Sequence, residues 1–198
     1  MDSINELLAD EELELIVVNT PNYTHFDYTI KALKAGKHVL LEKPAAGTSN
    51  EVKIIYDLSK KVNKQVMVYQ NRRWDSRFVQ VKQIIESGRL GEIAEVHFRI
   101  DRFKRSIGNK SFKETPLIPG SGLQYDLGSH LLDNAICLFG KRSGFIKTLG
   151  TYRHGSAVAD YFHYHLSYPD QLHVFLTSGL LIAEVLLGFT VHGSEGVL

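Results

Sequence analysis

The chain has 198 residues, of which 43% are hydrophobic and 23% charged, and its formal net charge is +1. These proportions are typical of a soluble globular protein and exclude a disordered or fibrous chain. The near-neutral charge offers no electrostatic basis for binding nucleic acid or an anionic membrane surface. Cys137 is the single cysteine, which excludes an intrachain disulfide framework and a cysteine-based zinc cluster.

No apolar run is long enough to span a bilayer, because the longest, around residues 179–183, stops at Glu184. The first residues are acidic and lack the basic segment that opens a signal peptide. The sequence therefore predicts a cytoplasmic protein with no membrane partner.

The first third of the chain alternates apolar runs with helical patterns. The runs predict buried parallel strands, and Thr48 to Glu51 form a capping box that opens the second helix. This order predicts half of a doubly wound, Rossmann-type α/β domain. The expected strands are residues 13–18, 39–41 and 66–69, and the expected helices are residues 26–35 and 48–62.

The pattern changes after Arg73. Strands at 161–166 and 172–176, joined by a tight turn, should pair antiparallel. We therefore expect a partial Rossmann domain at 1–72, followed by an incomplete α+β domain with a largely antiparallel sheet at 73–198. The other elements expected in the second domain are helices at 75–87 and 123–139, a strand at 93–103, a loop at 104–122 and strands from 145 onward.

The chain looks truncated at both ends. The first half of a doubly wound domain should hold a glycine-rich turn for pyrophosphate and an acidic residue for ribose, and nothing before Leu13 resembles either. The last residues, 188–198, stop in a strand or turn. A sheet left incomplete there would expose an edge to other chains.

Polar residues follow each of the three predicted parallel strands, where ligands bind in open α/β sheets. Ordinary turn chemistry would explain any one of these strand ends, but three together favour a binding site. They are Asn19, Thr20, Pro21, Asn22 and His25 after the first strand, Glu42, Lys43 and Pro44 after the second, and Gln70, Asn71, Arg72 and Arg73 after the third.

Lys43 is the most unusual of these residues, since it follows an apolar strand and precedes a proline that extends the backbone before it. An ammonium beside a substrate hydroxyl favours the alkoxide character that develops during oxidation. Glu42 could orient the lysine. The alternative is a surface Lys–Glu pair.

Asp126, His130 and Asp133 are spaced i, i+4 and i+7 in the predicted helix, so they should share a stripe about 60° wide. Two carboxylates beside an imidazole suit general acid–base catalysis. The same spacing could bind a metal ion, or it could be a solvated helix face with an Asp–His pair.

Alternation places Tyr161, His163 and His165 on one face of a later strand. Such a face could line a substrate pocket. Cover by a partner subunit would explain the same pattern, so we expect a homo-oligomer assembled through this sheet.

Together these motifs resemble the Gfo/Idh/MocA family of oxidoreductases, which is named after glucose–fructose oxidoreductase, inositol dehydrogenase and a rhizopine catabolism protein. The resemblance runs from about Leu7 to the C-terminus. It is carried by the order and spacing of Thr20-Pro21-Asn22 with His25, then Glu42-Lys43-Pro44, then Asp126 with Gly128, His130 and Asp133.

The resemblance implies a hydride transfer between NAD or NADP and a hydroxyl of a sugar or an inositol-like polyol, without a metal. It implies that Lys43 hydrogen-bonds the reacting hydroxyl, that His130 is the general base and that Asp126 supports the histidine or binds substrate. The positions that it implies for the cofactor are Thr20, Pro21, Asn22, His25, Glu42 and Lys43, with Gln70 or Asn71.

Two other functions stay open at this point. The same superfamily contains NAD-dependent glycoside hydrolases, which release sugar without net reduction of the cofactor. A non-catalytic fragment that only associates through an exposed sheet is the third possibility.

Overall fold

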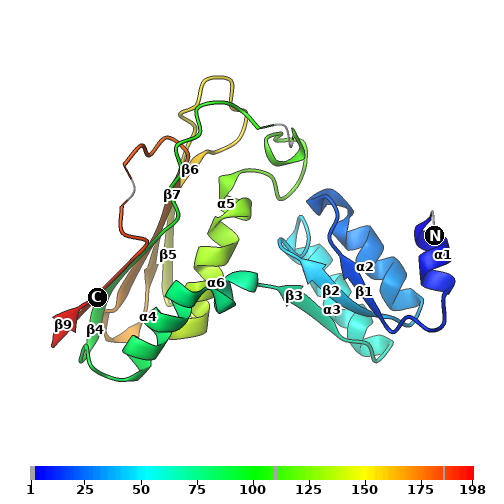
Figure 1. Ribbon diagram of the computed structural model, residues 1–198, viewed down its shortest axis with the longest axis horizontal. Coiled ribbons are helices and arrows are strands. Elements are labelled where there is room, and N and C mark those ends of the chain that lie inside the picture. The colour runs from blue at the N-terminus through cyan, green and yellow to red at the C-terminus, as the bar shows by residue number, and fades with distance from the viewer. Residues whose placement is uncertain (1–2, 109–110, 185) are drawn as a thin grey trace. The chain divides into compact units, whose positions relative to one another are not determined.

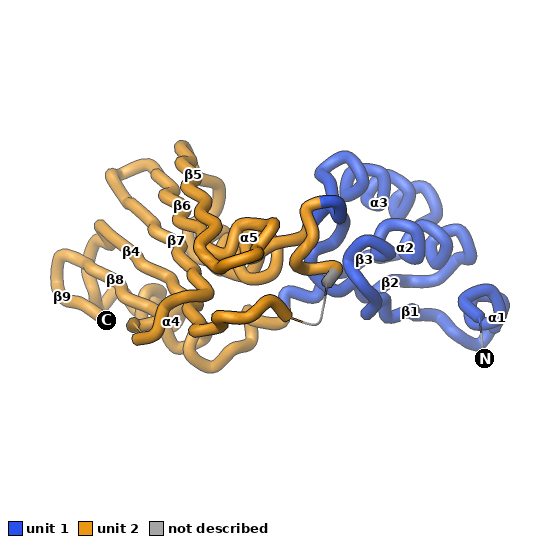
Figure 2. The backbone as a smooth tube through the Cα atoms, turned by 90° about the horizontal axis from the view of Figure 1, so that it is seen from above, with its two compact units in different colours: residues 1–70, 117–120 blue, residues 71–116, 121–198 orange. Residues whose placement is uncertain are grey.

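The computed structural model describes residues 3–108, 111–184 and 186–198. Its backbone divides into two compact units, which Figure 2 shows in different colours. Unit 1 consists of Met1–Gln70 and Leu117–Gly120, and unit 2 of Asn71–Pro116 and Ser121–Leu198.

Unit 1 is built on a three-stranded parallel sheet with the order β1-β2-β3, as the apolar runs predict. Its core lies where one face of this sheet meets helices α2 and α3, and includes Ile16, Leu33, Leu41 and Ile55. The strands are β1 (Leu15–Val18), β2 (His38–Glu42) and β3 (Val66–Tyr69), and the helices are α1 (Ile4–Ala9), the 3-10 helix η1 (Asn22–Thr24), α2 (His25–Lys34) and α3 (Ser49–Lys61).

The predicted capping box at the start of α3 is confirmed. The Thr48 hydroxyl accepts a hydrogen bond from the backbone N–H of Glu51 at 3.2 Å, and Glu51 Oε2 accepts one from the N–H of Thr48 at 3.0 Å. Two of the otherwise unpaired N–H groups at this helix end are thereby satisfied.

Unit 2 has a six-stranded sheet with the order β5-β6-β7-β4-β8-β9. All neighbours pair antiparallel except β4 and β7, which run parallel. The fold class expected from the sequence is therefore confirmed. The strands are β4 (Ile93–Arg99), β5 (Gly144–Gly150), β6 (Tyr161–Ser167), β7 (His173–Gly179), β8 (Phe189–Gly193) and β9 (Gly196–Val197).

Helices lie along one face of this sheet, as Figure 1 shows. Leu131 and Ala135 of α6 and Val81 of α4 join the inward side chains of the central strands in one core. Gly128 lets α6 approach β6, because a Cβ atom there would lie 3.3 Å from the Phe162 ring. The helical segments of unit 2 are η2 (Asn71–Trp74), α4 (Ser76–Glu86), η3 (Ser111–Lys113), α5 (Leu123–Asp126), α6 (Gly128–Phe139) and η4 (Pro169–Gln171).

The structure corrects two of the predicted elements. The helix expected at 123–139 is two helical segments, α5 and α6, which meet at Leu127 (φ −106°, ψ −32°). The strand expected at 93–103 ends at Arg99. No helix in the described part of the chain is long and apolar enough to cross a membrane.

Candidate active site

In unit 1, His25 joins the segments that follow β1 and β2. Its ring is almost fully buried, with Nδ1 2.7 Å from the carbonyl oxygen of Pro44 and Nε2 2.9 Å from that of Thr20. Both partners are carbonyl oxygens, which only accept, so the ring nitrogen that carries hydrogen donates to the carbonyl it faces. His25 thus positions the backbone after both strands and presents no ring nitrogen to a ligand.

Lys43 follows β2 directly, and its peptide bond to Pro44 is cis. Glu42 is the last residue of β2, and both side chains are half-buried. The residue expected to carry the chemistry of unit 1 therefore stands at the carboxyl end of the central strand, beside the peptide group that His25 binds.

The hydroxyls after β1 form a short chain of hydrogen bonds. Thr24 Oγ1 donates to the carbonyl oxygen of Pro21 at 2.7 Å, and it lies 2.6 Å from Thr20 Oγ1. Because a hydroxyl has one proton, Thr20 is the donor to Thr24. This chain fixes the turn that carries Pro21 and Asn22.

Two amide oxygens at the carboxyl edge of this sheet are buried without a hydrogen-bond partner among the described residues. They are Asn22 Oδ1, after β1, and Gln70 Oε1, at the end of β3. An unsatisfied buried acceptor costs about 1–3 kcal/mol, which a ligand bearing N–H or O–H groups would recover. A nicotinamide dinucleotide carries such donors in its carboxamide and ribose groups, so the residues present fit its nicotinamide end.

The segment Leu117–Gly120 completes this edge of unit 1. Asn22 Nδ2 donates to the carbonyl oxygens of Gly120 at 3.0 Å and Pro119 at 3.3 Å. Gly120 has φ +79°, and a Cβ there would lie 3.1 Å from Asn22 Nδ2. Glycine is therefore required for this close approach.

In unit 2, the three residues expected on one helix face belong to two consecutive helical segments. Asp126 ends α5, whereas His130 is buried in the first turn of α6. Asp133 forms a bidentate ion pair with Arg73, with both N–O distances 2.7 Å. This hydrogen bond raises the pKa of Arg73 against the effect of burial. That the three residues share one face stays a prediction. Asp133 ties α6 to η2 through Arg73.

A cavity of about 350 Å³ in unit 2 opens beside Asp126. Lys113 Nζ lies 2.7 Å from Asp126 Oδ1, and the two side chains form an ion pair. Six of its twelve lining residues are ionisable. Its ionisable lining residues are Arg102, Lys104, Lys113, Glu114, Asp126 and Arg153.

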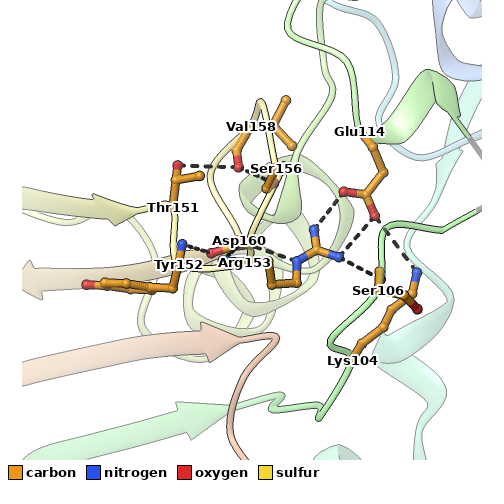
Figure 3. A network of polar contacts seen from close by, with 9 residues as sticks. All are labelled: Lys104, Ser106, Glu114, Thr151, Tyr152, Arg153, Ser156, Val158 and Asp160. Atoms are coloured by element: carbon orange, nitrogen blue, oxygen red, sulfur yellow. Dashed lines mark hydrogen bonds and ion pairs between the residues drawn. The ribbon is translucent and has the colours of Figure 1, made fainter.

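Arg153 anchors the wall of this cavity (Figure 3). Its guanidinium contacts Glu114 Oε2 at 2.7 Å and Asp160 Oδ2 at 3.2 Å, and it donates to the carbonyl oxygen of Ser106 at 3.2 Å. Burial works to lower the pKa of Arg153, but the hydrogen bonds and charges of Glu114 and Asp160 outweigh it and raise the pKa. The wall is thus held by a buried ionic network.

The sequence offered no signal for Lys113, Glu114 or Arg153. Lys113 and Glu114 lie in the segment expected to be a loop, and Arg153 follows β5 some forty residues later. No local period links them. Among the described residues, no group of three or more His, Cys, Asp and Glu side chains has a metal-binding arrangement.

Residues 1–70 match the family described as "Oxidoreductase family, NAD-binding Rossmann fold", and residues 78–198 match the "GFO/IDH/MocA C-terminal domain". The chain belongs to the Gfo/Idh/MocA family. The resemblance of the motifs to this family is therefore confirmed.

Curated relatives match nearly the whole chain. The uncharacterized oxidoreductase YdgJ of Escherichia coli is 40% identical over 190 residues, which are 96% of this chain and 54% of YdgJ. The scyllo-inositol 2-dehydrogenase (NADP(+)) IolW of Bacillus subtilis is 29% identical over 192 residues, 97% of this chain and 53% of IolW. The chain spans about half the length of these relatives.

Solved structures agree with this fold. An NAD-binding protein from Listeria innocua has a TM-score of 0.92 at 32% identity, covering 100% of this chain and 56% of its own. A levoglucosan dehydrogenase in complex with NADH and levoglucosan has a TM-score of 0.85 at 26% identity, with the same two coverages.

Proposed function

We propose that this chain carries the substrate-binding and proton-transfer residues of a dehydrogenase that oxidises a hydroxyl of a sugar or cyclic polyol with NAD or NADP. The observation that carries the proposal is the charged cavity beside Asp126, four residues before the buried His130. Two relatives support the substrate class, since one is a scyllo-inositol dehydrogenase and another binds levoglucosan.

The proposal gives each residue one role. His130 accepts the proton of the reacting hydroxyl, since an imidazole can take up a proton near neutral pH. Lys43 donates a hydrogen bond to the same oxygen and stabilises its developing negative charge. Asp126, which is paired with Lys113, accepts a hydrogen bond from the substrate or supports His130.

The nicotinamide ring supplies the hydride acceptor when the dinucleotide is bound. Asn22 and Gln70 offer their buried amide oxygens to it, and Thr20, Pro21 and Glu42 line the same carboxyl edge of the sheet. His25 and Lys43 complete the proposed set. His25 acts by positioning the segments that contact the cofactor, because both of its ring nitrogens face backbone carbonyls.

The cavity chemistry favours a polyhydroxylated substrate. A carboxylate accepts a hydrogen bond from a hydroxyl, whereas an ammonium or guanidinium group donates one to it. Arg102, Lys104, Lys113, Glu114 and Asp126 line about 350 Å³ and offer both kinds of partner. We further propose that the protein is cytoplasmic and forms homo-oligomers through the sheet of unit 2.

The test is cofactor reduction. The purified chain, and a fusion that places a glycine-rich strand–turn–helix segment before it to bind pyrophosphate, are assayed with NAD and NADP against scyllo-inositol, myo-inositol and levoglucosan. We expect absorbance of the reduced nicotinamide to rise with at least one polyol in the fusion.

Two outcomes contradict the proposal. Release of sugar from a glycoside without net cofactor reduction would identify a glycoside hydrolase. Absence of turnover in both proteins, with no binding of either dinucleotide by calorimetry, would identify a non-catalytic chain.

A further inference from the structure

The cavity beside Asp126 carries more positive than negative charge. Its cationic lining residues are Arg102, Lys104, Lys113 and Arg153, whereas its carboxylates are Glu114 and Asp126. Asp160, which pairs with Arg153, supplies a third carboxylate. One positive charge is therefore left over around a space of about 350 Å³, and the ion pairs show which side chain holds it.

Arg153 binds the wall of the cavity with all three of its guanidinium nitrogens (Figure 3). Nε donates to Asp160 at 3.2 Å, one terminal nitrogen donates to Glu114 Oε2 at 2.7 Å, and the other donates to the carbonyl oxygen of Ser106 at 3.2 Å. The side chain is almost fully buried. Arg153 therefore supports the wall and is not the surplus cation.

The two lysines of the cavity have carboxylate partners. Lys113 Nζ lies 2.7 Å from Asp126 Oδ1, and Lys104 Nζ lies 3.8 Å from Glu114 Oε1. A ligand that drew either lysine away would leave its carboxylate with less compensating charge. Neither lysine is therefore the surplus cation.

Arg102 is the remaining cation of the cavity. Within the described ranges of the chain, its guanidinium forms no ion pair. The carboxylate of the neighbouring Asp101 is already paired with Arg99 at 2.8 Å. Arg102 is exposed, so it offers a full charge and five N–H donors to a ligand in the cavity.

The backbone of Arg102 is fixed on the sheet, although β4 ends at Arg99. The N–H of Arg102 donates to the carbonyl oxygen of Gly179 at 2.9 Å, and its carbonyl oxygen accepts from the N–H of Ile182 at 3.1 Å. The side chain therefore starts from a held position. Less conformational entropy is lost when such a residue orders around a ligand.

We propose that Arg102 selects a sugar or cyclic polyol that carries an oxyanion, either a carboxylate or a phosphate. This inference rests on the proposed function and narrows its substrate class. A guanidinium presents two parallel N–H groups that match the oxygens of either anion. Arg102 is thus a specificity residue that binds a substituent of the substrate.

The charge of the cavity favours this substrate over a neutral polyol. An oxyanion would balance the surplus charge of Arg102, whereas a neutral polyol would leave it uncompensated. Charge-assisted hydrogen bonds are also roughly twice as strong as those between neutral groups. Of two sugars that differ only in this substituent, the anionic one should bind more tightly.

The experiment measures binding to the full chain by calorimetry with three probes, glucose, glucuronate and glucose 6-phosphate, which share one ring and differ at carbon 6. We expect at least one of the anions to bind at least about tenfold more tightly than glucose, and this preference to shrink at higher salt. Tighter binding of glucuronate would identify a carboxylate, and tighter binding of glucose 6-phosphate a phosphate. Equal affinities for all three probes, or no binding of any, would overturn the inference.

Matched variants test the assignment to Arg102. Arg102→Gln should abolish the preference for the anion, whereas Arg102→Lys keeps the charge without the paired N–H groups and should retain part of it. Arg105→Gln removes an exposed charge that does not line the cavity and should leave the preference unchanged. A preference that persists in Arg102→Gln, with circular dichroism unchanged, would contradict the assignment.

These binding measurements can fail independently of the cofactor assay. Reduction of NAD or NADP by a neutral polyol, together with equal affinities for glucose and its anions, would overturn the inference and leave the proposed function in place. Anion binding that depends on Arg102, without cofactor reduction by any polyol, would support the anion site and contradict the dehydrogenase.

Discussion

Arg153 illustrates at the scale of one residue how unit 2 maintains a charged cavity. Its side chain is 1% exposed, and so is that of Asp160. Such ions remain buried only when each has partners. Asp160 also accepts hydrogen bonds from the backbone N–H groups of Tyr152 at 2.8 Å and Arg153 at 2.9 Å. These bonds connect the two ends of the loop formed by residues 151–160.

Replacing Arg153 with Met should destabilise unit 2 by about 3–5 kcal/mol, because Asp160 and Glu114 are left as uncompensated carboxylates. Urea unfolding followed by circular dichroism measures the change. Arg89→Met is the control, since Arg89 is exposed, and it should change the free energy of unfolding by less than about 0.5 kcal/mol. Equal effects of the two variants would contradict this account of the network.

Tyr164 gives a prediction about pH. Burial, followed by the charge of Tyr125, raises its pKa to about 12. The folded state therefore holds the phenolic proton more tightly than the unfolded state, whose tyrosine titrates near pH 10. The stability that this proton contributes is present below about pH 10 and is lost as pH rises towards about 12.

The free energy of unfolding of Tyr164→Phe should accordingly fall less steeply across this alkaline range than that of the unaltered chain. Denaturant titrations at several pH values measure both slopes. Parallel slopes would show that the Tyr164 phenol ionises equally in both states.

At the scale of elements, the capping box in its first turn stabilises the start of α3. Replacing Thr48 with Ala removes the oxygen that accepts from Glu51 and should cost about 1 kcal/mol of stability. Thr48→Ser retains the hydroxyl and should cost far less. A loss of equal size in both variants, measured by urea unfolding, would mean that the cap contributes little.

The local pattern of hydrophobic residues predicted most of the helices and strands, because the residues that recur at helical or strand spacing are the ones that pack in the core. The strands of unit 1 and the β6–β7 hairpin lie where alternation and turn chemistry place them. The break between α5 and α6 escaped prediction, since residues 123–139 keep a helical period on both sides of Leu127. The parallel pairing of Glu95 with His173 is a long-range contact that no local period encodes.

In the candidate site, too, local patterns could be predicted from the sequence and long-range contacts could not. Lys43, Asp126 and His130 stand out as polar groups bounding apolar elements, and that position can be read from the sequence. The partners that set their environment could not be read in this way. Lys113 beside Asp126, the carbonyl of Pro44 beside His25, and Leu117–Gly120 beside Asn22 are all tertiary contacts.

At the scale of the whole molecule, the chain combines a parallel sheet with a mostly antiparallel one in two compact units, and it spans about half the length of its curated relatives. Unit 1 offers Lys43 and two unsatisfied amide oxygens, whereas unit 2 offers His130, Asp126 and the charged cavity. The proposed function needs both sets of residues, so its tests must be made on proteins that contain both units.

The most direct measurement is the rate of cofactor reduction by the Lys43→Ala variant. It is compared with the same protein without the substitution, either the chain or the fusion, whichever oxidises a polyol. The affinity for the dinucleotide is measured on the same samples. The account predicts a rate at least about a hundredfold lower, with affinity for the dinucleotide largely retained. A rate within about twofold of the unaltered protein, a difference of less than about 0.5 kcal/mol in the activation barrier, would contradict the assignment of Lys43 to the reacting oxygen.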